Sequence, residues 1–147
     1  MNSDSGALHR FLSAQATDYE LALAELRRGR KETHWIWYVL PQLRGLGSSA
    51  KSYEYGISDL AEAQAYIEHP ILGPRLREAV AAICAHQGVS AVDILGDVDA
   101  MKFKSCLTLF AAVERDQQFF QQALQQFFAG QPDPRTLQLL SACQQER

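Results

Sequence analysis

The chain has 147 residues, with 14 Lys and Arg against 17 Asp and Glu and a formal net charge of −3. This length fits one domain with its own apolar core, and the weak negative charge gives no general positive field to attract nucleic acid. No apolar stretch reaches the ~20 residues of a membrane-spanning helix, and the N-terminal residues predict no signal peptide. Three widely spaced cysteines indicate reduced thiols and predict a cytoplasmic protein.

The composition favours helices throughout the chain. Leu and Ala supply 38 residues, whereas Val, Ile and Thr supply 16, and unbranched side chains lose little rotamer freedom in a helix. No segment alternates polar and apolar residues as a half-buried strand would. We therefore expect an all-α fold: one domain over residues 1–147, built as a compact orthogonal assembly of seven or eight helices around a central aromatic-rich helix, with 1–6 and 144–147 disordered or frayed.

In the N-terminal half, capping residues and glycines predict where the helices begin and end. A short helix is expected over about 7–15, and a second helix should follow Thr17 or Asp18 as N-cap and end at Gly29. A third helix, over about 34–40, has Thr33 as its expected N-cap. Residues 41–58 show no clear period, and an irregular segment of this length in a compact domain is often functional.

The C-terminal half has clearer boundaries. Asp59 should cap a helix over 60–68, and Pro74 suits the first turn of an amphipathic helix that Gly88 closes. Further on, Ser90 should cap a short helix to Leu95, and Asp99 should cap a helix over 100–113. Asp116 should cap a helix that Gly130 ends. Asp133, which precedes Pro134, should cap the last helix.

The most aromatic stretch is "THWIWYVLPQLRGLG", residues 33–47. Aromatic and aliphatic side chains at helical spacing usually belong to the core, which is the preferred interpretation of Trp35 and Ile36. The polar atoms of His34, Trp37 and Tyr38 need partners when they are buried, and such partners often line a pocket.

Two cationic segments are candidates for binding an anion. "RRGRK", residues 27–31, has guanidinium groups suited to phosphate or carboxylate, although cations at a helix C-terminus also complement the dipole. Arg30 and Lys31 stand out because they immediately precede the aromatic stretch. In "MKFKSCLTLF", residues 101–110, Lys102 and Ser105 share a helix face, so Lys102 could activate Ser105 as a nucleophile or simply be a solvated lysine.

The sequence contains no HExxH, P-loop, GxSxG or dinucleotide-binding glycine motif. Asp97 and Asp99 form a DxD pair, but this pattern is ordinary turn and cap chemistry. We therefore expect no metal and no cofactor.

Together these stretches resemble one family, the small bacterial all-helical proteins known as domain of unknown function 1810. The resemblance covers nearly the whole domain and implies a compact helical fold without an established activity. It is carried by "RFLSAQ" at 10–15, "ALAELRRGRKETHWIWYVLPQLRGLGSSAKSYEYGI" at 22–57, "EAQAYIEHPILGPRL" at 62–76, "ILGDVDAMKFKSCLTLF" at 94–110 and "FFAGQPDPRTLQLL" further on. In size and in the Lys102-Phe103 element the chain is also similar to the NADAR proteins, which are associated with NAD and ADP-ribosyl chemistry.

Aromatic and cationic residues beside one another suggest a site for an anionic, nucleotide-like small molecule such as an NAD or ADP-ribose derivative, which the protein would bind or hydrolyse. His34, Lys102 and Ser105 are the candidate catalytic residues. The candidate ligand-binding residues are Arg30, Lys31, Trp35, Tyr38, Gln42, Ser49, Tyr53, Tyr55 and Lys104. The alternatives are a module without catalysis that binds a protein partner or forms a homodimer, and a core helix followed by a capped loop.

Overall fold

The computed structural model describes residues 7–114 and 118–145, and within them the protein is entirely helical. Nine helices occur there, and three of them have only four or five residues. In chain order they are α1 His9–Arg28, α2 Ile36–Val39, α3 Ala50–Glu54, α4 Leu60–Glu68, α5 Leu72–Cys84, α6 Ala91–Leu95, α7 Asp97–Ala111, α8 Phe119–Phe128 and α9 Pro134–Gln145. The all-α class is confirmed.

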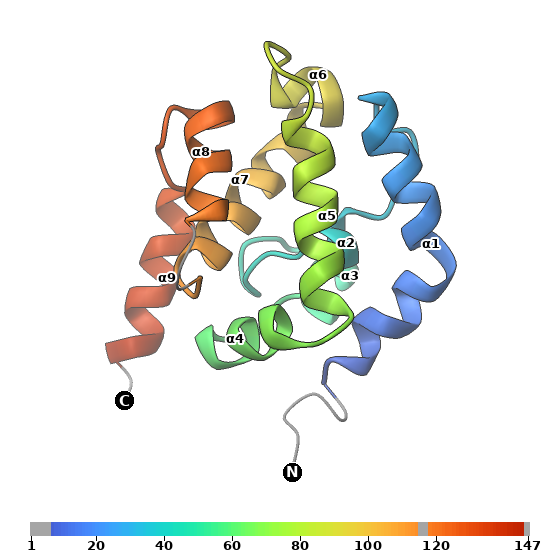
Figure 1. The fold of residues 1–147 in the computed structure, drawn as a ribbon. Coiled ribbons are helices and arrows are strands. Elements are labelled where there is room, and N and C mark those ends of the chain that lie inside the picture. The colour runs from blue at the N-terminus through green and yellow to red at the C-terminus, as the bar shows by residue number, and fades with distance from the viewer. Residues whose placement is uncertain (1–6, 115–117, 146–147) are drawn as a thin grey trace.

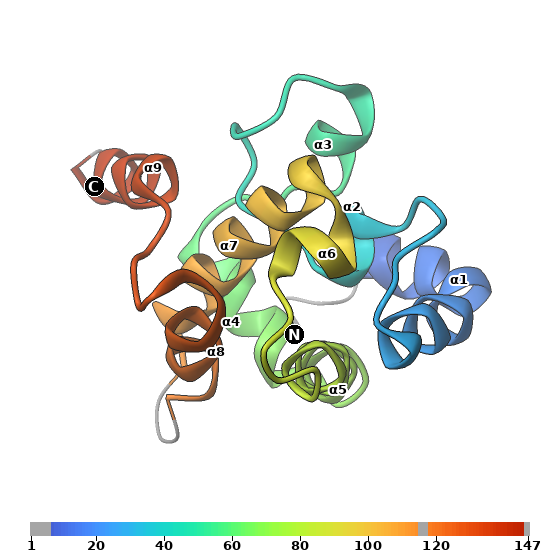
Figure 2. The ribbon, with the colours of Figure 1, turned by 90° about the horizontal axis from the view of Figure 1, so that it is seen from above.

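Helix α7 runs through the middle of the molecule, with α4, α6, α8 and α9 packed against it (Figures 1 and 2). Helices α1 and α5 lie side by side, and α2 packs on α1. The central position therefore belongs to α7 and not to the aromatic segment at 34–40. Among the described residues, no helix is long and apolar enough to cross a membrane.

A chain of aromatic contacts connects the helices through the core. The ring of Phe11 in α1 lies 5.0 Å from that of Tyr66 in α4, which lies 5.4 Å from Phe110 in α7. Phe110 is in turn 5.7 Å from Phe120 in α8. All four residues are completely buried, so four helices share one continuous aromatic core.

The two helices expected before Gly29 are a single helix. Helix α1 runs without interruption from His9 to Arg28, so the prediction of an N-cap at Thr17 or Asp18 is wrong. The side chain of Asp18 instead accepts a hydrogen bond from the hydroxyl of Tyr38, twenty residues later. The C-terminal boundary is confirmed, because Gly29 adopts the left-handed conformation with φ +82°.

Three other boundaries differ from those expected. Helix α2 begins at Ile36, with Trp35 and not Thr33 at the N-cap. Helix α7 begins at Asp97, two residues before the expected cap Asp99, whose carboxylate is used in an ion pair. Helix α5 has Pro74 in its first turn, as expected, but ends at Cys84, ahead of Gly88. Asp116, the expected cap of α8, lies outside the described residues, as do the terminal segments 1–6 and 146–147.

Three predicted N-caps are confirmed in atomic detail. Asp59 accepts a hydrogen bond from the Glu62 amide at the start of α4, and Ser90 accepts from the Asp93 amide at the start of α6. At the start of α9, Asp133 accepts from both the amide and the hydroxyl of Thr136. Each of these caps is a local motif in which the bonding groups are three residues apart.

The segment expected to be irregular contains the short helix α3. A parallel bridge between Leu43 and Ile57 closes its base, and residues 44–56, which we call the 44–56 loop, project from the body (Figure 2). Arg10 secures this base: its guanidinium donates to the carbonyl oxygens of Glu54 and Gly56, both at 2.8 Å, and pairs with the Glu62 carboxylate at 3.0 Å. The C-terminal end of the loop is thus tied to α1 and α4.

Candidate functional site

A buried carboxylate explains the start of the aromatic stretch. Glu25 in α1 is 1 % exposed, and its oxygens accept from the amides of Glu32 and Thr33, the hydroxyl of Thr33 and Nε1 of Trp35 at 2.7 to 3.1 Å. Burial pushes the pKa of Glu25 upward, but these donors outweigh it and lower the pKa from 4.5 to about 2. Trp35, a predicted ligand-binding residue, is therefore fully buried with its polar atom bonded to Glu25.

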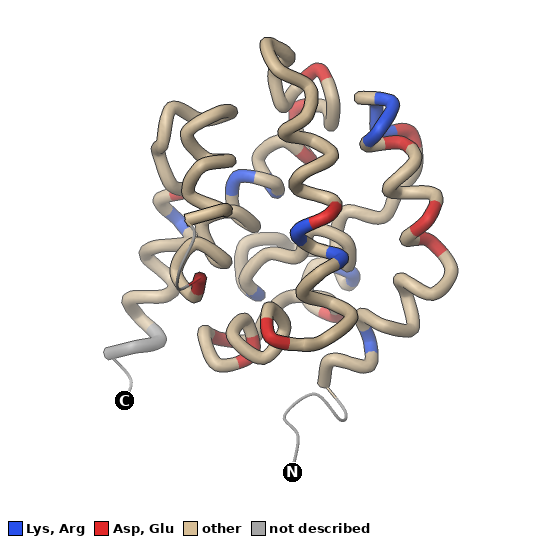
Figure 3. The backbone as a smooth tube through the Cα atoms, in the orientation of Figure 1, with Lys and Arg blue, Asp and Glu red and all other residues tan. Residues whose placement is uncertain are grey.

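Lys31, a second predicted ligand-binding residue, is also engaged within the protein. Its Nζ lies 2.7 Å from the Asp99 carboxylate, with the two side chains 6 % and 18 % exposed, and it donates to the Thr33 carbonyl at 2.6 Å. Its backbone amide donates to the Ile94 carbonyl at 2.7 Å. These contacts connect the end of α1 to α6 and α7, whereas the neighbouring Arg30 is exposed and forms no ion pair with a described residue. Figure 3 shows the cations gathered at this end of α1.

Two predicted residues, Tyr38 and Tyr55, lie together with Asp18 in a second cluster. Their rings are 5.1 Å apart, and the Tyr38 hydroxyl donates to the Asp18 carboxylate. Burial, together with this carboxylate, raises the pKa of Tyr38, and burial with nearby Glu54 raises the pKa of Tyr55. Both phenols are consequently neutral at ordinary pH. His34 lies on the surface beside this cluster, and its carbonyl is 3.4 Å from the Tyr38 hydroxyl.

The third cluster, which we call the Trp37 site, consists of Trp37, Lys51 and Lys102. The Nζ atoms of Lys51 in α3 and Lys102 in α7 lie 4.9 and 5.2 Å from the centre of the Trp37 ring. Neither lysine forms an ion pair with a described residue. Among the described residues, Nε1 of Trp37 is also the one buried side-chain nitrogen or oxygen that lacks a hydrogen-bond partner. The site thus presents an unused donor and two unpaired positive charges.

The remaining predicted residues in the 44–56 loop and next to it have mainly structural contacts. Ser49 caps α3 by accepting from the Ser52 amide at 3.1 Å, and the Gln42 carbonyl accepts from the Ile57 amide at the base of the loop. Tyr53 is 67 % exposed, with the guanidinium of Arg44 over its ring at 4.4 Å.

The predicted residues of α7 point in different directions. Lys102 reaches the Trp37 ring, whereas Lys104 reaches the Phe128 ring of α8, with Nζ 5.7 Å from its centre. The Ser105 hydroxyl donates to the Met101 carbonyl at 3.1 Å within the helix. No described hydrogen bond or ion pair joins any of these three residues to His34, Tyr38 or Tyr55. The structure thus distributes the candidate residues among several clusters.

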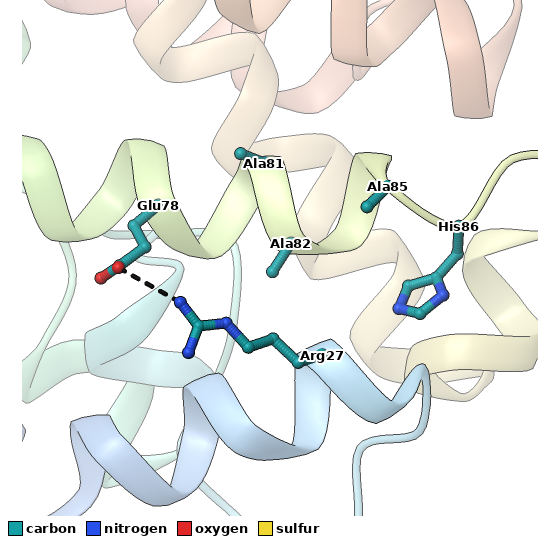
Figure 4. Close-up of a pocket in the computed structure, with 6 residues that line it drawn as sticks. All are labelled: Arg27, Glu78, Ala81, Ala82, Ala85 and His86. Carbon is teal, nitrogen blue, oxygen red and sulfur yellow. Dashed lines mark hydrogen bonds and ion pairs between the residues drawn. The ribbon is translucent and has the colours of Figure 1, made fainter.

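A shallow groove of about 320 Å³ lies elsewhere, between α1 and α5 (Figure 4). Three alanines, Ala81, Ala82 and Ala85, leave space along α5. The charged groups on its walls already have partners: Arg27 pairs with Glu78 at 3.5 Å, and His86 Nε2 is 2.8 Å from the Leu26 carbonyl. Glu78 also accepts from the Tyr19 hydroxyl at 2.6 Å. This groove therefore offers a ligand little that is chemically unsatisfied.

Sequence reasoning did not single out Glu25 or Lys51, and it singled out Asp18 only as a helix cap. Glu25 and Asp18 look like ordinary polar positions of an amphipathic helix, because their partners lie seven to twenty residues further on. Lys51 did carry a signal, since it is the one cation among residues 45–56 of the aperiodic segment. Trp37 was noted for its polar atom, but only the fold shows that this atom has no acceptor.

Comparisons with known proteins place the chain in a family without an assigned activity. It is 48 % identical to the conserved hypothetical protein Rv1873 from Mycobacterium tuberculosis, whose crystal structure matches with a TM-score of 0.89 over 91 % of this chain and 96 % of that one. No curated protein matches. The family model described as "Protein of unknown function (DUF1810)" matches residues 5–140. The chain therefore belongs to the DUF1810 family.

Proposed function

We propose that the protein binds an anionic, nucleotide-like small molecule and that the Trp37 site holds its anionic group. The observation that carries this proposal is the buried indole N–H of Trp37, which has no acceptor although two unpaired ammonium groups lie against the same ring. An unmade hydrogen bond of this kind costs about 1–3 kcal/mol, and native proteins seldom leave one without a reason.

An oxyanion satisfies all three groups at once. One oxygen would accept the hydrogen bond from Trp37 Nε1, and the flexible side chains of Lys51 and Lys102 would turn their ammonium groups towards the remaining oxygens. The negative charge of the bound group would also attract both ammonium groups. Lysine acts on phosphate as a point charge, so the arrangement favours a group with several equivalent oxygens.

The proposal gives Lys102 a role in binding the ligand and does not include hydrolysis of the ligand. Of the three residues predicted for catalysis, Lys102 alone contacts Trp37. The Ser105 hydroxyl donates to a helix carbonyl, and His34 has no side-chain hydrogen bond to a described residue. A binding experiment on the Trp37 site is therefore the first test.

The test is a titration of the full chain with inorganic phosphate, pyrophosphate, ADP-ribose and NAD. Thermal melting and tryptophan fluorescence measure the binding. We expect at least one of these anions to raise the melting temperature. Trp37→Phe removes an unsatisfied donor, which is favourable, and also part of a partly buried ring, which is unfavourable, so it should change the stability of the free protein by about 1 kcal/mol or less. The same variant, as well as Lys51→Met and Lys102→Met, should weaken binding by about tenfold or more.

Lys104→Met is the matched control. It removes a lysine from the same helix whose ammonium lies on Phe128 instead, so it should leave binding unchanged. The proposal fails if none of the four anions binds, or if Lys104→Met weakens binding as much as Lys102→Met does.

A further inference from the structure

Helix α7 has an exposed apolar strip immediately beside the Trp37 site. Val98 is 68 % exposed and Met101 is 53 % exposed, although most apolar residues further along this helix are completely buried. Isolated exposed apolar residues are common on protein surfaces, but adjoining ones often mark a binding surface. The two residues are three apart, so their side chains are neighbours on the helix.

The strip and Lys102 lie on the same side of α7. Val98 precedes Lys102 by four residues and Met101 precedes it by one, so the three positions fall within an arc of about 100°. The Val98 and Lys102 positions are separated by about 6 Å along the helix axis. Since the Lys102 ammonium contacts Trp37, a molecule whose anionic group occupies the Trp37 site could reach the strip through a spacer of a few bonds.

The chemistry of the strip suits a flat apolar group. Methionine has a flexible, polarizable side chain that packs well against the face or edge of a ring, and Val98 extends this surface by one turn. Covering the two side chains would remove apolar area from water, which is favourable. An inorganic anion alone would leave the strip exposed.

We infer that the ligand is an anion joined to an apolar ring, an inference that rests on the proposed function. The ring covers Val98 and Met101, and the anionic group is held by Trp37, Lys51 and Lys102. The strip then determines which anions bind tightly. The preferred ligands are thereby nucleotides and other ring-bearing phosphates, which should bind more tightly than inorganic phosphates and small organic acids.

The experiment compares pyrophosphate with ADP, which carries the same anionic group attached to a ring system, by calorimetry on the full chain. ADP should bind about tenfold more tightly than pyrophosphate. Met101→Gln, which keeps a helix-forming side chain of similar length, should reduce this ratio to about threefold or less and leave pyrophosphate affinity unchanged. Leu137→Gln, at a residue of α9 that is 46 % exposed, is the matched control and should leave both affinities unchanged.

The outcomes separate this inference from the proposed function. If pyrophosphate binds and ADP binds no more tightly, the strip does not contact the ligand, and the inference fails while the proposed function stands. If neither binds, both fail. If Met101→Gln alters the sedimentation of the protein and leaves the ADP-to-pyrophosphate ratio intact, the strip is a contact between copies of the chain and the inference is overturned.

Discussion

At the scale of single residues, the two neighbouring tryptophans have opposite roles. Nε1 of Trp35 is bonded to Glu25 at 2.9 Å, and the ring is completely enclosed. Nε1 of Trp37 has no partner among the described residues, and its ring is only partly buried. The difference arises because helix α1 supplies a carboxylate to one indole and nothing to the other. This difference indicates a structural role for Trp35 and supports the proposed binding role of Trp37.

Glu25→Gln should destabilise the protein by about 3 kcal/mol near neutral pH, because it removes the charge that four hydrogen-bond donors stabilise and that keeps the pKa of Glu25 well below its usual value. The folded-state pKa of about 2 lies below the unfolded value of 4.5. The stabilisation is therefore present in full above pH 4.5 and is lost as the pH falls towards 2. Urea unfolding at pH 6 and pH 3 measures it, and the difference between wild type and variant should shrink to about 1 kcal/mol at pH 3.

Glu20→Gln, at an exposed position of the same helix, is the control for this measurement and should change the free energy of unfolding by about 0.5 kcal/mol or less. If the difference in the free energy of unfolding between Glu25→Gln and wild type stays constant from pH 6 to pH 3, the Glu25 charge does not stabilise the fold.

At the scale of elements, Arg10 determines how the 44–56 loop is held. One guanidinium group joins α1 to two loop carbonyls and to the Glu62 carboxylate of α4. Burial pushes the pKa of Glu62 upward, but the hydrogen bond from Arg10 contributes to a net decrease. The loop in turn carries Lys51 to the Trp37 ring. Loop position and site geometry are therefore linked through Arg10.

Arg10→Met should lower the free energy of unfolding by about 2–3 kcal/mol, because it leaves the largely buried Glu62 carboxylate without its ion-pair partner. The loop base should open more readily, so hydrogen exchange should accelerate at the amides of Arg44 and Ile57, which bond across the base. Arg28→Met breaks an ion pair whose side chains are both more than half exposed, and it should cost about 0.5 kcal/mol or less. If Arg10→Met and Arg28→Met lower the free energy of unfolding equally, Arg10 does not hold the base of the 44–56 loop as inferred.

The helices that could be predicted from the sequence are those whose boundaries depend on neighbouring residues. The caps of α4, α6 and α9 lie within one turn of the groups they bind. The continuous α1 and the four-residue α2 depend instead on distant partners, because Asp18 bonds to Tyr38 and Glu25 bonds to Trp35. The candidate residues of α7 also face different neighbours: Lys102 and Lys104 are two residues apart, which places them on different sides of a helix, and they lie against rings of α2 and α8.

At the scale of the whole molecule, Cys106 provides a reporter of cooperative unfolding. It is completely buried in α7, and burial strongly raises its pKa. In a variant whose only cysteine is Cys106 (Cys84→Ala, Cys143→Ser), labelling by a thiol reagent should require global unfolding, because α7 packs against helices on several sides. The opening free energy from the labelling rate should agree with that from urea unfolding to within about 1 kcal/mol.

The complementary variant that retains only Cys84 (Cys106→Ala, Cys143→Ser) should be labelled through smaller openings, since this thiol is partly exposed, although burial still raises its pKa to about 11. Labelling of Cys106 at an opening free energy well below that of urea unfolding would show that α7 separates from the core while the rest of the protein remains folded.

The closed base of the 44–56 loop has a consequence for evolution. Leu43 and Ile57 meet in one bridge, so the chain leaves and re-enters the packed body at the same place. Insertions between these points would add little strain, since doubling the length of a flexible loop costs only about 0.6 kcal/mol in closure entropy. Trp37 and Lys102 lie on helices of the packed body, whereas Lys51 lies on the loop. Descendants of this chain can thus change the length and composition of the loop that carries Lys51, while Trp37 and Lys102 stay in place on the packed helices.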